Sequence, residues 1–226
     1  MISRRFKDIS VVVVVAVIVV GGVTLALMSS SSMQWFVREG DTLSFTVEVE
    51  GFKREFDPLN SSIWNDTAPP YSHLNISSFT IEVLELPTLT SVYTADSFAS
   101  HVIEHTKSSL TSPIVLVNGT ELPDEDYQFL NVLVSRSILP IGGWIRLDEF
   151  YPNEPDFMYQ CDTYLSSSDV STFTIGHRYY NIDSGRGWNA AVNKSTGVPI
   201  RATLWENEIL GNTWISYSVT VILTST

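Results

Sequence analysis

An uncharged, apolar block near the N-terminus constrains this chain more than any other feature. No Asp, Glu, Lys or Arg occurs from Ile9 to Val37, and the 18 residues from Val11 to Met28 are almost entirely aliphatic. At about 1.5 Å of rise per residue, a helix over residues 9–28 is about 30 Å long, which matches the hydrocarbon core of a bilayer. We therefore expect residues 9–28 to be a transmembrane helix that lies in the lipid bilayer.

The charges that flank this block predict its orientation. Arg4, Arg5 and Lys7 precede the block with only Asp8 opposing them, whereas uncharged serines follow it. Basic residues stay on the cytoplasmic side of a membrane helix. We expect a single-pass protein of the cell membrane with a cytoplasmic N-terminus (1–8), the membrane helix (9–28), a linker (29–39) and an extracytoplasmic β-rich domain (40–226).

Two other interpretations of the apolar block are weaker. A cleaved signal peptide has a shorter apolar region and small residues at the cleavage site, and Ala26-Leu27-Met28 fits that pattern poorly. A buried helix of a soluble protein seldom contains a run of Val and Ile such as residues 11–20. An uncleaved anchor is favoured, and cleavage remains an open alternative.

Charge and cysteine content exclude several functional classes. Setting aside three bases and one acid in residues 1–8, the 13 bases and 25 acids of the chain fall to 10 and 24, which leaves the exterior part strongly acidic. Nucleic-acid binding needs clustered Lys and Arg, so we expect no nucleic-acid partner. A single Cys excludes an intramolecular disulfide and Cys-rich metal sites.

Acceptor triplets for N-glycosylation occur throughout the exterior part. The candidate residues are Asn60, Asn65, Asn75, Asn118 and Asn193. Five triplets are about twice the number expected by chance, so both chance and selection for glycosylation are compatible with them. Three of the five lie in a segment rich in Pro, Asn and Ser, which we expect to be a loop.

Alternating apolar and polar residues predict strands along most of the exterior part. Two strands are expected over residues 43–49 and 79–83, and a buried strand over residues 114–117. The last third predicts a four-stranded antiparallel meander over residues 173–179, 188–192, 198–204 and 215–223, with Ile200 on its inward face. The fold class is therefore mainly β (α+β).

One helix is expected to cover this sheet. Residues 96–109 begin with a capping Asp96 or Ser97, carry Phe98 and Val102 at helical spacing, and precede Pro113. A sheet with one apolar face needs a cover, so we predict that this helix packs across the concave side of the meander. Its apolar strip is narrow, and we expect loops such as residues 139–144 to complete the core rather than leave a groove.

Four sequence segments carry a resemblance to known families. They are Gly40-Asp-Thr-Leu-Ser-Phe-Thr-Val, Leu139-Pro-Ile-Gly-Gly-Trp, Tyr180-Asn-Ile-Asp-Ser-Gly and Asn193-Lys-Ser-Thr-Gly-Val-Pro. The chain resembles an uncharacterised group of single-anchor archaeal surface proteins. The Asn193 segment between two strands is also similar to the meander of lipoprotein-carrier half-barrels, and this similarity implies a curved sheet that encloses an apolar groove.

One motif suggests metal chemistry. His101-Val-Ile-Glu104-His105 fits the inverted zinc-peptidase pattern, in which both His bind zinc from one helical face and the Glu activates water. Such enzymes need a third ligand, and the candidates Glu125, Glu149 and Glu154 fall in segments that we expect to be loops. We therefore expect no metal site at His101 and His105, and keep a zinc-dependent hydrolase as the alternative.

Other candidate residues have ordinary structural explanations. The acidic residues Asp124, Glu125, Asp126, Asp148, Glu149, Glu154 and Asp156 lack the spacing of a calcium loop. His177 shares a strand face with apolar residues, and Cys161 has no neighbouring base to activate it. Trp64 and Trp144 fall in expected loops, where each either packs or offers a binding platform.

These features predict a membrane-anchored, extracytoplasmic binding or surface-structural protein. We expect no enzyme activity, no catalytic residues and no cofactor. A surface-layer protein, a glycan or an apolar ligand is the expected partner besides the bilayer. The alternatives are the zinc-dependent hydrolase and a carrier of an apolar ligand or lipid.

Overall fold

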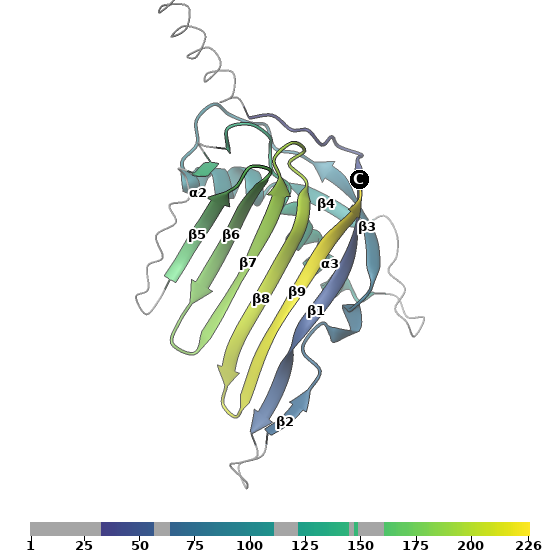
Figure 1. Ribbon diagram of the computed structural model, residues 1–226, viewed down its shortest axis with the longest axis vertical. Coiled ribbons are helices and arrows are strands. Elements are labelled where there is room, and N and C mark those ends of the chain that lie inside the picture. The colour runs from purple at the N-terminus through teal and green to yellow at the C-terminus, as the bar shows by residue number, and fades with distance from the viewer. Residues whose placement is uncertain (1–32, 57–63, 111–121, 145–146, 149–160) are drawn as a thin grey trace, which may run out of the picture.

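The domain is built on one long antiparallel sheet. The computed structural model describes residues 33–56, 64–110, 122–144, 147–148 and 161–226. Its strands are β1 (Thr42–Phe56), β2 (Trp64–Thr67), β3 (Ser78–Glu85), β4 (Lys107–Leu110), β5 (Cys161–Ser168), β6 (Thr172–Tyr180), β7 (Ser184–Asn193), β8 (Pro199–Leu210) and β9 (Thr213–Ser225). Their order is β4-β3-β1-β9-β8-β7-β6-β5, with β2 paired to β1 beside this path (Figure 1).

The predicted N-terminal strands are confirmed and are longer than expected. In β1, Leu43, Phe45 and Val47 are buried between more exposed polar residues, and β3 buries Phe79, Ile81 and Val83 in the same way. Phe45 lies opposite Phe79, and their rings stack with centroids 5.6 Å apart. The alternation therefore indicated both the strands and the face that each one buries.

The predicted C-terminal meander is confirmed as β6 to β9. It is extended by β5, which was not predicted, and by β1, which pairs with β9 along most of its length. The expectation for Ile200 is wrong, because its side chain is 40% exposed while Ala202 is buried. A register irregularity where β7 meets the start of β8, between Ala191 and Val192, interrupts the regular pairing next to Ile200.

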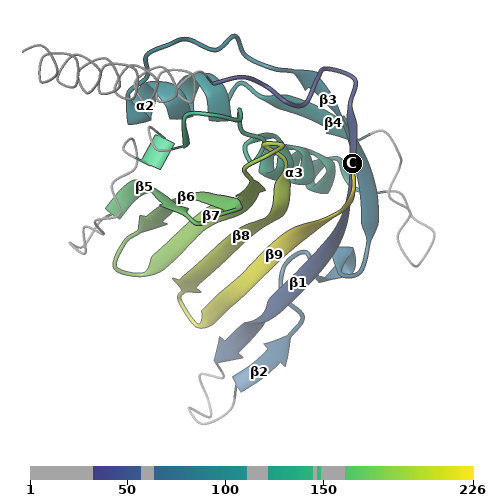
Figure 2. The ribbon, with the colours of Figure 1, turned by 45° about the horizontal axis from the view of Figure 1, so that its top comes forward.

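The helix that packs on this sheet is α3 (Asp124–Ser135), not the predicted helix over residues 96–109. Acidic side chains occupy its first turn and Arg136 follows its last turn, which suits the helix dipole at both ends. Leu130, Leu133 and Val134 are buried, and the helix contacts β4 and β8. Figure 2 shows α3 lying against the concave side of the sheet.

The predicted helix over residues 96–109 is much shorter in the structure. Thr94 forms a capping box with Ser97, α2 (Ala95–Phe98) continues into a π-helical turn, η2 (Ala99–Ile103), and the chain then enters β4. Lys107 begins β4 and forms an ion pair with Glu85 of β3. Pairing with the edge of β3 gives the backbone of residues 107–110 hydrogen-bond partners, so the polar Ser-Ser segment ends the helix.

Two segments outside the sheet complete one end of the core. In the expected linker, Val37 is buried and Gln34 pairs with Ile141 through backbone hydrogen bonds. Leu139 is also fully buried, and Trp144 packs on Phe173 with ring centroids 5.2 Å apart. The loop over residues 139–144 therefore contributes to the core as expected. The expectation that such loops leave no groove is wrong, because cavities of about 560 and 620 Å³ remain beside α3.

Several predicted features lie outside the described residues. These are the membrane helix (9–28), the strand over residues 114–117, the acceptors Asn60 and Asn118, and the acidic residues Glu149, Glu154 and Asp156. Within the described part of the chain, no helix is long and apolar enough to cross a bilayer.

Candidate ligand groove

The concave face of the sheet is filled at one end and hollow at the other. Where the loop over residues 139–144 and the C-terminal half of α3 meet the sheet, Phe173, Ile175 and Val192 have no exposed surface. Further along the same strands, the register places His177 opposite Trp188, and Trp188 opposite Leu204. Trp188 is a buried member of the core and Leu204 packs against that core, and both residues, with His177, also line cavities.

Three adjoining cavities surround Arg136, the residue that ends α3. Cavities of about 560 Å³ and about 620 Å³ share Arg136, His177 and Trp188 as lining residues. A third cavity of about 300 Å³ lies along α3 beside Phe129, Val132 and Arg136. We call these three cavities together the Arg136 groove.

The two larger cavities differ in character. The first is mostly apolar and is lined in part by Leu84, Ile103, Val132 and Tyr164. The second is more polar, because Arg186 and Glu206 enter it from β7 and β8. An elongated molecule with one apolar and one polar part therefore fits the groove better than a uniformly polar one.

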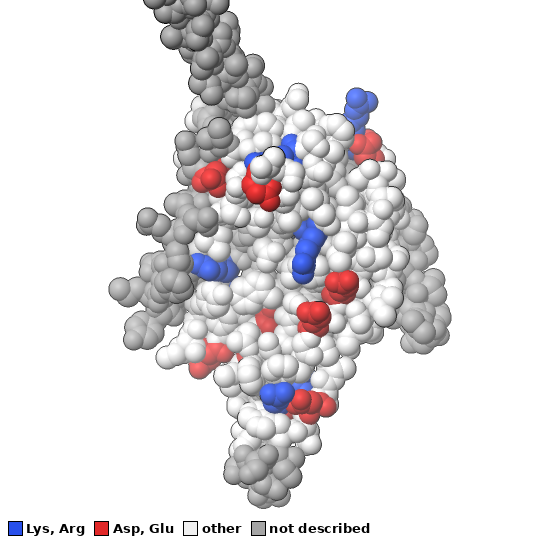
Figure 3. Space-filling view, viewed as in Figure 1, with Lys and Arg blue, Asp and Glu red and all other residues white. Residues whose placement is uncertain are grey.

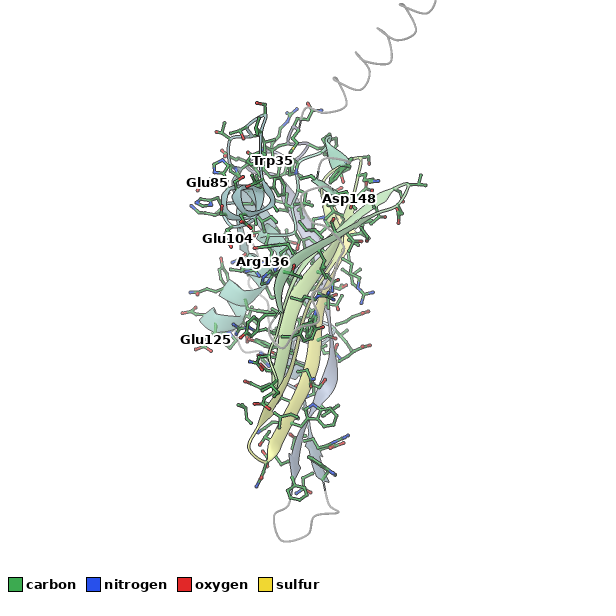
Figure 4. The ribbon with its side chains drawn as sticks, turned by 90° about the vertical axis from the view of Figure 1, so that its left-hand side faces the viewer. Trp35, Glu85, Glu104, Glu125, Arg136 and Asp148 are labelled. Atoms are coloured by element: carbon green, nitrogen blue, oxygen red, sulfur yellow. The ribbon has the colours of Figure 1, made fainter. Side chains whose placement is uncertain are left out.

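Arg136 lies on the sheet side of α3, whereas Glu125 lies near the outer end of the helix (Figure 4). The guanidinium of Arg136 is 5.4 Å from the centre of the Trp188 ring, a distance suited to a cation–π contact. Burial lowers the pKa of Arg136, with Tyr164 and Glu104 opposing this effect through weaker, longer-range attraction. Among the described residues, no carboxylate lies within ion-pair distance of Arg136.

The carboxylate of Glu206 accepts a hydrogen bond from a tyrosine. The hydroxyl of Tyr217 donates a hydrogen bond to Glu206 at 2.6 Å. Burial, and then this hydrogen bond, raise the pKa of Tyr217 far above its usual value, so the phenol stays protonated. Arg186 is the register partner of Glu206 across β7 and β8, yet these two described side chains form no ion pair. Arg186 instead lies over the ring of Tyr179 at 5.5 Å.

The zinc-peptidase motif is not arranged as a helical metal site. His101 lies in η2 and hydrogen-bonds the carbonyl of Thr88 at 3.0 Å, and His105 hydrogen-bonds the carbonyl of Ser100 at 2.6 Å. The two rings are 6.0 Å apart, and both side chains are exposed. No group of three or more potential ligands is found within the part of the chain that the structure describes.

The acidic candidates are separated in space or paired with other groups. Asp124, Glu125 and Asp126 form the first turn of α3, and Asp126 is buried against His73 with 2.6 Å between the nitrogen and oxygen. Asp148 accepts a hydrogen bond from the hydroxyl of Ser166. Asp126 and Asp148 therefore have structural partners, and Glu125 lies in the first turn of a helix and not in the expected loop.

The described glycosylation acceptors differ in how free their side chains are. Asn65 is exposed in β2, whereas the Oδ1 atom of Asn75 accepts a hydrogen bond from the backbone N–H of Val49. The Oδ1 atom of Asn193 accepts from the backbone and hydroxyl of Ser195. Asn65 is thus the described acceptor whose surroundings best suit a glycan.

The two tryptophans expected in loops have different environments. Trp144 lies against Phe173 and donates its indole hydrogen to the carbonyl of Lys194 at 3.2 Å, so it packs. Trp64 lies in strand β2 instead of a loop, and its side chain is 47% exposed beside Phe56. Cys161 opens β5.

The principal groove residues were missed from the sequence, except His177. Arg136 and Trp188 lie 52 positions apart, and their contact depends on how α3 sits on the sheet. A local signal for α3 was available, because Asp124, Glu125 and Asp126 follow Pro123 and precede apolar residues at helical spacing. His177 had been interpreted as a core or rim residue. It is partly buried, lines three cavities, and its ring centroid lies 4.6 Å from that of Tyr164.

Comparisons with known proteins do not place the chain in a family. No protein-family model, curated protein or solved structure matches it. The groove geometry is therefore the basis for a functional proposal.

Proposed function

We propose that this protein is a membrane-anchored, extracytoplasmic binding protein that holds an elongated, partly apolar ligand in the Arg136 groove. The observation that carries the proposal is that the concave face keeps cavities of about 560 and 620 Å³ beside a closed core. Ligand sites in proteins commonly occupy 300–1,000 Å³ and combine apolar walls with a few polar groups. The groove matches this description in size and in lining.

The opposite face of the sheet supports the same choice of site. Viewed from that face, Lys, Arg, Asp and Glu are few and scattered over a mostly uncharged surface (Figure 3). Small-molecule recognition needs a concavity that removes the ligand from water, and the larger cavities lie on the helix side of the sheet. A carrier of an apolar ligand or lipid is the form of binding protein that this geometry favours.

A neutral, apolar dye tests the proposal directly. Nile red, whose emission rises in apolar surroundings, should bind the full-length chain held in non-ionic amphipol, with empty amphipol as the blank. Val132→Trp should weaken binding about tenfold or more, because Val132 lines two of the three cavities and its side chain is 49% exposed at the surface of α3. Fluorescence titration measures both proteins.

The matched control places the same residue change outside the groove. Val170 is 100% exposed in the turn between β5 and β6, so Val170→Trp should leave Nile red binding unchanged. Equal binding by Val132→Trp and Val170→Trp, or no binding above the amphipol blank, would exclude the groove as a ligand site.

A second prediction concerns membrane topology. If residues 9–28 anchor the chain with the N-terminus inside, protease added to intact cells should digest the region after Ser32 and spare residues 1–8. The physical reason is the excess of Arg4, Arg5 and Lys7 on one side of the apolar block. Immunoblots with tags at the two termini would report the outcome, and a protected C-terminal tag in intact cells would contradict the orientation.

A further inference from the structure

We propose that the Arg136 groove selects ligands with an anionic head, a carboxylate or a phosphate, attached to one apolar chain. This inference rests on the proposed binding function and names the class of ligand. The juxtaposition that carries it is an arginine without a described carboxylate partner, placed where all three cavities meet.

Arg136 differs from the other described cations by its place among the cavities. Lack of an ion pair does not by itself distinguish it, because Arg178, Lys194 and Arg201 also form none with a described residue. Arg136, however, lines all three cavities of the groove. Lys53, Arg54 and Lys107 each form an ion pair on the surface. Arg136 and Arg186 both line the polar cavity instead, and neither has an ion-pair partner among the described residues.

A half-buried guanidinium is stabilised when a bound ligand places an anionic group beside it. Burial removes part of its hydration, and the face of Trp188 replaces only a fraction of that loss. Arg offers several N–H donors in a planar fork that suits carboxylate and phosphate oxygens. Such hydrogen bonds are strong where water is excluded, so the head group contributes selectivity as well as affinity.

The surroundings also indicate where each part of the ligand lies. The head belongs in the cavity lined by Arg136 and Arg186, because that cavity has the larger share of polar groups. The chain belongs in the cavity lined by Leu84, Ile103 and Val132, which is mostly apolar. Two carboxylates lie near the ligand in this arrangement. Glu206 lines the polar cavity and accepts a hydrogen bond from Tyr217, whereas Glu104 lines the apolar cavity and attracts Arg136 at longer range.

Three ligands with the same chain length and different heads test the inference on the unmodified protein. Hexadecanoate, hexadecyl phosphate and hexadecanol compete with Nile red for the full-length chain in non-ionic amphipol. We expect at least one of the two anions to displace the dye at about a tenfold lower concentration than the alcohol. The anion with the larger advantage identifies a carboxylate or a phosphate as the natural head.

A pair of arginine variants shows whether Arg136 is responsible. Arg136→Gln should reduce the advantage of the anion over hexadecanol to about threefold or less while Nile red still binds. Arg201→Gln, at an exposed position of β8 that lines none of the three cavities, should keep the full advantage. Equal displacement by all three ligands would overturn the anion inference and leave the binding function intact, whereas failure of Nile red to bind would overturn the binding function itself.

Discussion

Val102→Asp should unfold the domain or bring it close to unfolding. Val102 lies in η2 with no exposed surface, and the core cluster includes its neighbour Ile103 and the α2 residue Phe98. A carboxylate there loses its hydration without gaining a partner, and it replaces an apolar contact. We expect a loss of about 2–5 kcal/mol in the free energy of unfolding, which is a large share of the 5–15 kcal/mol typical of a domain.

The control for this change is Val92→Asp. Val92 is 71% exposed in the segment that leads to α2, so the same carboxylate stays in water there. Its effect on stability should be within about 0.5 kcal/mol of zero. Urea titrations followed by tryptophan fluorescence would measure both variants, and similar midpoints for the two proteins would show that η2 is not part of the cooperative core.

Most strands of the sheet were predictable because the pattern that indicates a strand lies in consecutive residues. In β1, β3 and the first half of β6, apolar and polar side chains alternate with a period of two, and this pattern is the condition for burying one face. In β8 the alternation is interrupted near Ile200, which is why the inward face was wrongly predicted there. The β5 strand was harder to predict, because its sequence of Cys-Asp-Thr-Tyr-Leu-Ser-Ser-Ser is mostly polar. Among the described strands it is the last one of the sheet and pairs only with β6, so burial does not impose a clear pattern on its residues.

The helices were less predictable because two segments, residues 96–109 and α3, each have an apolar face that could cover the sheet. Residues 96–109 carry helical spacing, but the residues from Lys107 onwards pair with β3 and become a strand. The helix that covers the sheet is α3. Its buried residues Leu130, Leu133 and Val134 are separated by polar and acidic neighbours. Helical spacing predicted an apolar face only for residues 96–109, and the helix over residues 124–135 was not predicted. Tertiary contacts decide which helix lies on β8.

The groove could not be predicted because its residues are ordinary when they are considered singly. An arginine after a helix and a tryptophan in a strand occur in most domains. They form a candidate site here because α3 ends over β7, which brings Arg136 close to Trp188. At that place Arg136 has no carboxylate partner among the described residues. Sequence periodicity contains no information on such a crossing.

Gly197→Ala should cost about 3 kcal/mol or more, although it adds a single methyl group. Gly197 has φ +69°, and a Cβ atom there would lie 1.9 Å from the carbonyl oxygen of Leu139. The same two residues are joined by a hydrogen bond from the N–H of Leu139 to the carbonyl of Gly197 at 2.9 Å. The backbones are therefore too close for any side chain at position 197, and the loop that begins at Leu139 must move.

The matched variant Gly211→Ala separates this contact from backbone strain. Gly211 has φ +58° in the turn between β8 and β9, and no atom lies within 4 Å of the position of its Cβ. Both variants lose about 1 kcal/mol of stability because alanine adopts the left-handed conformation poorly. The additional loss in Gly197→Ala therefore measures how strongly the loop that begins at Leu139 packs against residue 197. That loop also positions Trp144 on Phe173, so near-UV circular dichroism should change in Gly197→Ala and not in Gly211→Ala. Equal losses of stability with an unchanged aromatic signal would mean that the loop yields easily and does not close the core at this end of the sheet.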